Sequence, residues 1–280
     1  MTTSTTHTAD ADYILGHDER ELERLARQAS FYEEMTADVF VRAGIGPGMR
    51  VLDLGCGVGD VSLIAASLVG PSGSVVAIDR APDAVRTTQR RADAAGCRWV
   101  RAELGELETY VAPQSFDAIV GRFVFVYVRD PAATLRNLLR SLRPGGIVAL
   151  HEMDCRSVRS IPDLPIVREM LRWIVTAYER VGFEPDMGSH LAQTYVRAGL
   201  PLPQLIGTAR IESGPDAATY EYFAETLRSA QPVIEKLGIA SREEMDLDTL
   251  AARFRAAATA ANACIQNPVL VGAWARNQSP

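Results

Sequence analysis

The segment VLDLGCGVGD, residues 51–60, constrains the fold more than any other part of this chain. A short strand-like run that is largely apolar leads directly into glycines at positions 55, 57 and 59. Glycine permits positive φ angles and lets other groups come close to the backbone. The next residues, 60–70, have the pattern of a helix that ends at a glycine. The segment therefore predicts a buried strand, a tight turn that approaches a ligand, and a helix.

The alternation of strand and helix continues through the first half of the chain. The strands are apolar on both faces, which is typical of a parallel sheet covered by helices on both sides. We therefore expect an α/β fold whose ligand lies at the carboxyl ends of the strands. The predicted strands are 50–55, 74–79, 98–103, 116–122 and 147–154. The predicted helices are 60–70 and 82–96, and residues 130–146 are predicted to form a capped helix followed by a tight turn.

The flanking segments are more helical. One or two amphipathic helices are expected over 18–44, and helices over 164–182, 190–199, 216–238 and 242–264. Residues 203–213 and 267–276 each have the pattern of a strand. We expect a flexible tail over 1–17 and one domain over 18–280. Within it, the ligand-binding core covers about 45–154, and a helical cap, about 214–264, is inserted between two strands and packs over the sheet.

Composition excludes several classes of protein. The net charge of −6 and pI of about 5.4 do not favour a nucleic-acid-binding surface. No apolar run approaches the roughly 20 residues that a membrane-spanning helix needs. The four cysteines lie far apart, so neither a metal site nor a disulfide framework is expected. The N-terminus has no apolar centre of a secretory signal. We expect a cytoplasmic protein that binds neither nucleic acid nor membrane; the oligomeric state stays open.

Two acids indicate the ligand. Asp79 ends the second strand, 20 residues beyond Gly59, where a carboxylate can accept two hydrogen bonds from a ribose diol. Asp53 precedes the first glycine by two residues, and a carboxylate is unfavourable beside a pyrophosphate but favourable beside an amino group. S-adenosylmethionine (SAM) carries an adenosine and an amino group and no phosphate. The sequence therefore predicts SAM as the cofactor and disfavours a dinucleotide.

Four motifs, VLDLGCGVGD, VVAID, FDAIVGRFVFVYVRDP and LRPGGIVAL, resemble the successive motifs of class I SAM-dependent methyltransferases. Within this class the chain is similar to the ubiquinone-biosynthesis-type group of small-molecule methyltransferases. The resemblance covers residues 45–154, and YILGHDERELERLARQA and MGSHLAQTYVRAGL extend it more weakly. It implies a Rossmann-like fold with a mostly parallel seven-stranded sheet, N-terminal helices and a helical cap insertion.

The resemblance also implies a SAM site, residue by residue. The glycines would line the methionine part, Asp53 would lie near its amino group, and Asp79 would hold the ribose. Glu103 stands where the family usually has an aspartate that binds adenine. Two N-terminal residues match positions that close over the cofactor. The full set is Tyr13, Gln28, Asp53, Gly55, Gly57, Gly59, Asp79, Arg80, Glu103, Leu104 and Arg122.

The fifth strand ends in HEMD, which supplies the catalytic candidates Glu152, His151 and Asp154. A base there would accelerate methylation of a hydroxyl or a carbon acid. We expect Glu152, at the ligand edge of the sheet, to be the general base. Aromatic residues of the second half could line an apolar acceptor pocket: Trp173, Tyr178, Phe183, Tyr220, Tyr222 and Phe223.

The sequence favours SAM-dependent methylation of a small, apolar or aromatic molecule on oxygen, nitrogen or carbon. Three alternatives stay open. The first is C-methylation of a prenyl diphosphate with Mg²⁺ holding the phosphates. The second is an RNA- or protein-directed methyltransferase, and the third is a SAM-binding protein without catalysis.

Overall fold

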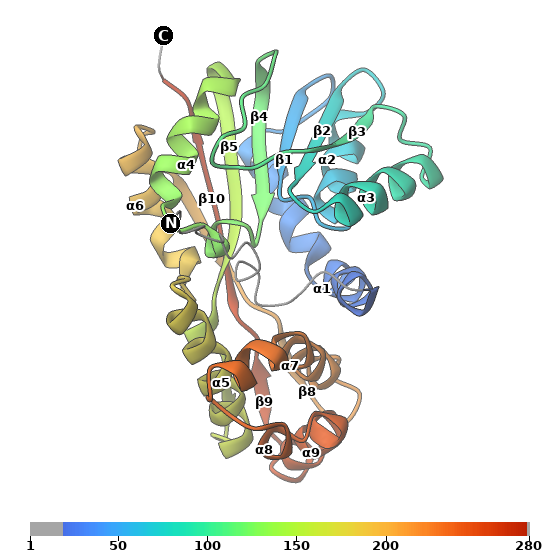
Figure 1. Ribbon diagram of the computed structural model, residues 1–280, viewed down its shortest axis with the longest axis vertical. Coiled ribbons are helices and arrows are strands. Elements are labelled where there is room, and N and C mark those ends of the chain that lie inside the picture. Colours follow the sequence, from blue (N-terminus) through green and yellow to red (C-terminus); the bar gives the residue numbers. More distant parts are fainter. Residues whose placement is uncertain (1–18, 279–280) are drawn as a thin grey trace, which may run out of the picture.

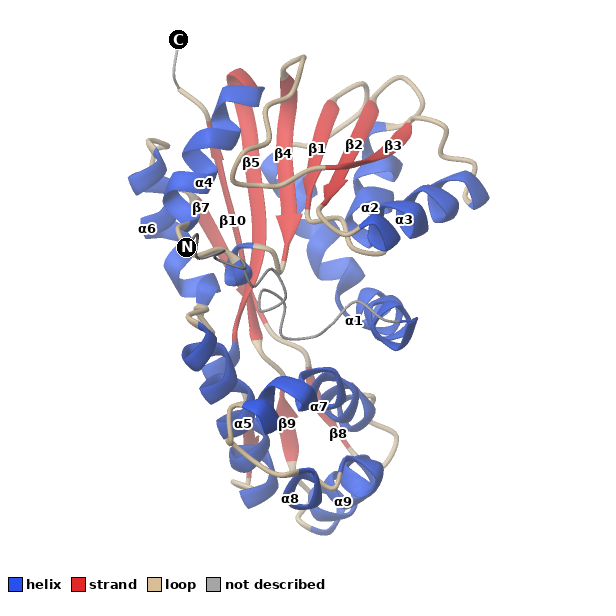
Figure 2. Ribbon diagram, viewed as in Figure 1, coloured by secondary structure: helices blue, strands red, loops and turns tan. Residues whose placement is uncertain are grey.

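A seven-stranded sheet forms the core of the upper lobe of the molecule (Figure 2). The structure is a computed structural model that describes the backbone of residues 19–278 and the side chains of residues 31–278. The strand order is β3-β2-β1-β4-β5-β10-β7. The first five strands along the chain are parallel, and β10 is antiparallel to both of its neighbours. The bounds are β1 (Arg50–Leu54), β2 (Ser74–Asp79), β3 (Val100–Leu104), β4 (Phe116–Arg122), β5 (Leu142–Asp154), β7 (Gln204–Thr208) and β10 (Val269–Arg276).

Helices cover both faces of this sheet, as the doubly apolar strands predict. On one face, α1 (Glu19–Ala43), α2 (Asp60–Val69) and α3 (Pro82–Ala94) pack on side chains such as Val51 and Ala149. On the other face, α4 (Pro131–Leu138) and α6 (Met187–Ala198) cover Leu52 and Leu150. Successive residues of a strand point to opposite faces. His151 therefore points toward α1, and Glu152 points toward α4 and α6.

A second lobe lies beyond the carboxyl ends of the parallel strands (Figure 1). We call it the cap lobe and define it as residues 155–182 and 211–266. It contains α5 (Pro165–Val181), α7 (Thr219–Lys236), α8 (Arg242–Met245) and α9 (Leu247–Ala260) around a small sheet of β6 (Arg159–Ile161), β9 (Cys264–Gln266) and β8 (Ile211–Ser213). The helices predicted at 216–238 and 242–264 thus lie at the edge of the large sheet, not over its face, and α5 joins them.

Several predicted boundaries differ from the structure. Within 130–146, where a helix and a tight turn are predicted, the helix ends at Leu138 and a 3₁₀ turn follows over Leu139–Ser141. Strand β5 then begins at Leu142 and not at 147. The single strand predicted over 203–213 is two strands, β7 and β8, in different sheets. The start of the third strand moves from 98 to Val100. Among the described residues, no helix has the length and apolarity to cross a lipid bilayer.

Helix α1 lies close against β10 because residue 272 is a glycine. A β-carbon built at Gly272 would lie 2.3 Å from Cγ2 of Val39, a buried residue of α1. A β-carbon at Gly207, on the neighbouring strand β7, would meet Val269 at an ordinary 3.5 Å. This close contact lets the preceding turn of α1, which carries Thr36, reach the carboxyl ends of β4 and β5 at Arg122 and His151.

Gly272→Ala should therefore destabilise the protein, because the added methyl group forces α1 away from the sheet. Overpacking of a buried contact costs typically about 1–3 kcal/mol. Urea denaturation followed by circular dichroism measures the change, with Gly207→Ala as the matched control. Equal midpoints for the two variants would show that α1 tolerates the displacement.

Candidate active site

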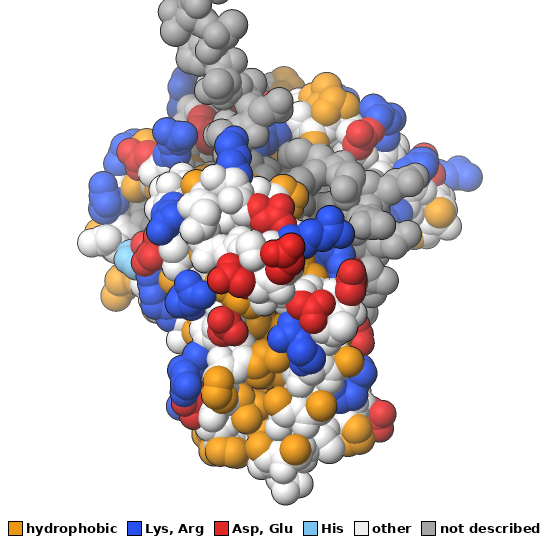
Figure 3. Space-filling view, turned by 60° about the horizontal axis from the view of Figure 1, so that its bottom comes forward, with side chains coloured by type: hydrophobic (Ala, Val, Ile, Leu, Met, Phe, Trp, Pro, Cys, Tyr) orange, Lys and Arg blue, Asp and Glu red, His pale blue; other side chains and the backbone are white. Residues whose placement is uncertain are grey.

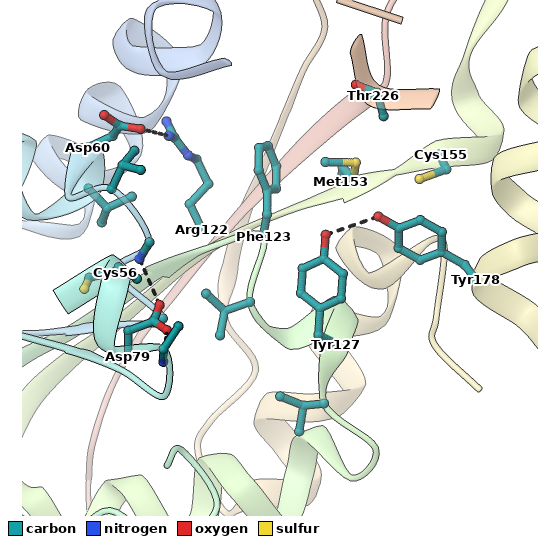
Figure 4. Close-up of a pocket in the computed structure, with 18 of the residues that line it drawn as sticks. Cys56, Asp60, Asp79, Arg122, Phe123, Tyr127, Met153, Cys155, Tyr178 and Thr226 are labelled. Atoms are coloured by element: carbon teal, nitrogen blue, oxygen red, sulfur yellow. Dashed lines mark hydrogen bonds and ion pairs between the residues drawn. The ribbon is translucent and has the colours of Figure 1, made fainter. Parts of the chain in front are cut away.

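A cavity lies at the carboxyl edge of the sheet, between the sheet and the cap lobe (Figure 4). One end, the loop end, is formed by the turns that follow β1, β2 and β3, and its polar side chains include Asp60, Asp79 and Glu106. The other end, the cap end, is lined mainly by α5, α7 and the segment after β5. Arg122 and Phe123 lie between the two ends.

The glycine turn of the loop end adopts left-handed backbone conformations. Gly55, Gly57 and Gly59 have φ angles of 55°, 54° and 90°. A β-carbon at Gly55 would lie 3.0 Å from Val124, and one at Gly59 would lie 3.0 Å from Thr88. Gly55 and Gly57 line the cavity, whereas Gly59 contacts α3 and begins α2. The turn therefore exposes backbone to the cavity at two of the three predicted glycines.

Asp79 holds this turn from the neighbouring strand. One carboxylate oxygen accepts the N–H of Gly57 at 3.0 Å, and the other accepts the N–H of Ala81 at 2.9 Å. Asp79 and the exposed Arg80 both line the cavity. The strand-ending acid thus both orders the glycine turn and presents its carboxylate to the loop end.

Asp53 lies beneath the turn, not in the cavity wall. Its side chain is completely buried, and Ser62 of α2 donates a hydrogen bond of 2.5 Å to one carboxylate oxygen. Burial raises the pKa of Asp53 to about 7. The carboxylate that lines the cavity beside the glycines is Asp60, the first residue of α2, which the sequence analysis did not select.

A buried polar chain connects Asp60 to the inner face of α1. The Arg122 guanidinium lies 3.8 Å from Asp60 and donates a hydrogen bond of 3.1 Å to the hydroxyl of Thr36. The second oxygen of Asp60 pairs with Arg91 at 2.6 Å. Nδ1 of His151 lies 3.1 Å from the Thr36 hydroxyl. Burial and the nearby Arg122 lower the pKa of His151 to about 3, so this imidazole is neutral.

The acids of HEMD point away from the cavity. Oε1 of the fully buried Glu152 accepts the N–H groups of Val124 and Phe125, at 2.9 and 2.8 Å. Burial raises the pKa of Glu152 to about 7, although these hydrogen bonds oppose the shift. Asp154 accepts hydrogen bonds from the backbone and hydroxyl of Ser189 in α6. Glu152, His151 and Asp154 do not line the cavity, whereas Met153 between them does.

The remaining predicted positions fall at or beyond the rim. Glu103 accepts a hydrogen bond from the Tyr110 hydroxyl at 2.8 Å and pairs with Arg101, and Leu104 is 60% exposed. Neither lines the cavity, but the next four residues, 105–108, do. Tyr13 lies outside the described residues, and the side chain of Gln28 also lies outside them. Their predicted closing role stays a prediction.

The cap end is apolar and uncharged. None of the described cap-lobe residues that line it is Asp, Glu, His, Lys or Arg. Its hydroxyl groups come from Tyr127 and Tyr178, whose oxygens lie 3.2 Å apart, and from Tyr222 and Thr226. Of the predicted aromatics, Tyr178, Tyr222 and Phe223 line the cavity; Trp173, Phe183 and Tyr220 do not. Tyr127 was missed because it stands in the continuous apolar run FVFVYV.

Across the side chains that the structure describes, no group of three or more His, Cys, Asp and Glu residues is placed to hold a metal ion.

Comparison with known sequences identifies the first half of the chain. Residues 45–180 match the family model described as "Methyltransferase domain". The chain is 38% identical over 105 residues to nocamycin O-methyltransferase from Saccharothrix syringae, which covers 37% of this chain and 38% of that protein. It is 32% identical over 140 residues to 2-phytyl-1,4-naphtoquinone methyltransferase from Synechococcus elongatus, with coverages of 47% and 57%.

The curated relatives are longer than the matched part. The chain spans about half the length of the first relatives it matches, for example 49% of an uncharacterized protein from Streptomyces fradiae that is 33% identical over 174 residues. The family match supports the class I assignment, and the ubiquinone-biosynthesis-type subgroup stays a prediction.

Solved structures agree on the fold. A putative methyltransferase from Bacillus halodurans superposes with a TM-score of 0.59 at 15% identity, over 87% of this chain and 99% of that one. Haemonchus contortus phosphoethanolamine N-methyltransferase 2, solved with S-adenosylhomocysteine, has a TM-score of 0.54 at 17% identity, over 88% and 53%. The family match identifies a methyltransferase domain over residues 45–180, and the strand order, the glycine turn and the solved structures show the Rossmann-like fold of class I SAM-dependent methyltransferases.

Proposed function

We propose that the protein transfers the methyl group of SAM to a small, uncharged, largely apolar acceptor. The observation that carries this proposal is the division of one cavity into a polar loop end and an uncharged cap end. Methyl transfer needs a donor and an acceptor in one line, and much of the rate comes from holding them in that geometry. The two ends of the cavity meet at Phe123, where donor and acceptor would approach each other.

The residues of the loop end fit SAM. Gly55 and Gly57 offer backbone without side chains, and Asp79 offers a carboxylate that can accept hydrogen bonds from a ribose diol. Arg122 is a buried cation in the cavity wall whose nearest carboxylate is 3.8 Å away, so it suits the carboxylate of the methionine part. Asp60 lines the cavity whereas Asp53 does not, so in this proposal Asp60 receives the amino group. When bound, SAM supplies an electrophilic methyl group on a sulfonium.

The cap end favours a neutral acceptor. Burying a diphosphate against uncharged side chains would be costly, and the described cap-lobe residues in the wall supply no compensating charge. The names of two relatives, nocamycin O-methyltransferase and 2-phytyl-1,4-naphtoquinone methyltransferase, agree with a small organic acceptor. Acidic and basic side chains are interspersed on the face shown in Figure 3, which does not favour a polyanion as substrate. The atom that is methylated stays open.

Calorimetry with SAM, S-adenosylhomocysteine and NAD tests the donor. Methyl transfer from radiolabelled SAM to a panel of small phenols, amines and quinols, with total tRNA alongside, tests the acceptor class. Label in a small molecule supports the proposal, label in tRNA rejects it, and tight SAM binding without any turnover points to a non-catalytic protein.

Asp79→Ala should weaken SAM binding at least about tenfold, because charge-assisted hydrogen bonds are worth roughly 1.5–3 kcal/mol each. Asp79→Asn should lose less SAM affinity than Asp79→Ala, since the amide oxygen of asparagine can still accept a hydrogen bond from the Gly57 N–H. Calorimetric dissociation constants measure both, with Asp248→Ala as a control because that side chain is 89% exposed. Wild-type affinity in Asp79→Ala would remove Asp79 from the donor site.

Tyr178→Phe should lower kcat/KM for the acceptor by roughly 2–10-fold, the value of one lost hydrogen bond, and leave SAM affinity unchanged. Tyr127→Phe should behave alike, since the two hydroxyls are paired. Tyr220→Phe is the matched control because its hydroxyl donates to Gly214 and does not line the cavity. Steady-state kinetics measure these changes. Equal kcat/KM values for all three variants would show that the acceptor does not bind the hydroxyls of Tyr127 and Tyr178.

A further inference from the structure

The turn after β4 has an unusual backbone conformation. Phe123 has a φ of 56°, in the left-handed region, and Val124 returns to the right-handed region with φ −110° and ψ −47°. A left-handed residue followed by a right-handed one turns successive N–H groups toward one point and makes a small anion-binding concavity. Residues with a β-carbon adopt the left-handed conformation only at a cost, so surrounding contacts must hold it.

The end of β5 supplies those contacts. The N–H of Phe123 donates to the carbonyl of His151 at 3.0 Å. The next two N–H groups, of Val124 and Phe125, both donate to Oε1 of Glu152. Oε1 of Glu152 is therefore the acceptor that fills this concavity, and three consecutive amides of the turn depend on two adjacent residues of β5.

This turn carries the side chains at the middle of the cavity. The Phe123 ring lies edge-to-face with Tyr32 of α1, with centroids 5.6 Å apart, and the Arg122 guanidinium carbon lies 5.6 Å from its centroid. Tyr127 ends the 3₁₀ turn Phe125–Tyr127 and reaches Tyr178 of the cap lobe. Figure 4 shows both side chains between the loop end and the cap end. A movement of the turn would displace both of them.

We propose that Glu152 is a positioning residue: as a hydrogen-bond acceptor it fixes the turn that aims Phe123 and Tyr127 between donor and acceptor. This inference rests on the proposed function, because the turn can orient side chains for methyl transfer only if SAM and an acceptor bind in this cavity. Glu152 does not line the cavity, so it has no direct path to an acceptor proton. Its carbonyl-like oxygen matters for the reaction, and its negative charge matters less.

Two conservative variants separate this role from general-base catalysis, because they change opposite properties. Glu152→Gln keeps the length and an acceptor oxygen for both amides but cannot take a proton. Glu152→Asp keeps the carboxylate but retracts it by one methylene from the amides. Positioning predicts that kcat/KM stays within about threefold of wild type in Glu152→Gln and falls roughly 10-fold or more in Glu152→Asp. A general base predicts the reverse order, with Glu152→Gln reduced by roughly 10²–10⁴-fold.

A second readout needs no acceptor. The protein has eight phenylalanines, and labelling them with 4-fluorophenylalanine gives ¹⁹F resonances, of which that of Phe123 is assigned by its loss in Phe123→Leu. We expect the Phe123 resonance to keep its position in Glu152→Gln and to move in Glu152→Asp. Wild-type spectra for both variants, or a greater loss of activity in Glu152→Gln than in Glu152→Asp, would overturn the proposal.

Asp117→Glu is the control. Asp117 lies near the opposite end of β4, where its carboxylate accepts the N–H of Arg50 at 2.8 Å, so this variant makes a one-methylene change far from the cavity. It should leave both readouts at wild-type values. Calorimetry with S-adenosylhomocysteine on the wild type tests the proposed function separately. If the wild type does not bind S-adenosylhomocysteine, the proposed function is rejected. If it binds normally and the Glu152 variants keep wild-type kcat/KM and Phe123 resonances, only the positioning role is rejected.

Discussion

Hydrogen bonds from backbone N–H groups to acids on neighbouring strands fix the two central turns at the carboxyl edge of this sheet. Asp79 at the end of β2 holds the glycine turn that follows β1, and Glu152 at the end of β5 holds the turn that follows β4. Strands β1 and β4 are adjacent, and the chain order of the sheet changes direction between them. Both turns contain left-handed residues, Gly57 and Phe123. The two central turns of the site are thus each fixed from the flanking strand.

The two ends of the cavity differ in their charged side chains. At the loop end, Arg122, Asp60 and Arg91 form a chain in which each charge has an opposite neighbour, and the buried His151 beside it stays neutral. At the cap end, polarity comes from hydroxyl groups alone among the described cap-lobe residues of the wall. Electrostatic interactions are stronger away from bulk water. This difference between the two ends supports the proposed arrangement, with a charged donor at the loop end and an uncharged acceptor at the cap end.

Much of this could be predicted from the sequence, because the governing signals are local. Doubly apolar strands, alternate glycines and a strand-ending acid identified the parallel sheet, the turn and Asp79. Side-chain direction was harder. Alternation along β5 predicts that His151 and Glu152 face opposite sides, yet only the packing of α1, α4 and α6 shows that both sides are closed. Tyr127 was missed because it stands in an apolar run that is typical of a core segment. Asp60 was missed because an acid at that position is typical of the first turn of a helix. The left-handed conformation of Phe123 has no signal in its residue type.

The two ends of the cavity are encoded by separate stretches of the chain. The loop end comes from residues 55–108, whereas the cap end comes chiefly from Met153–Tyr178 and Tyr222–Leu227. Substitutions on the inner sides of α5 and α7 can therefore reshape the cap end and leave the loop end intact. Under the proposed function, this separation would allow the acceptor to change through a few side chains on two helices. The same two helices would be the place to re-engineer acceptor scope without altering the residues proposed to hold SAM.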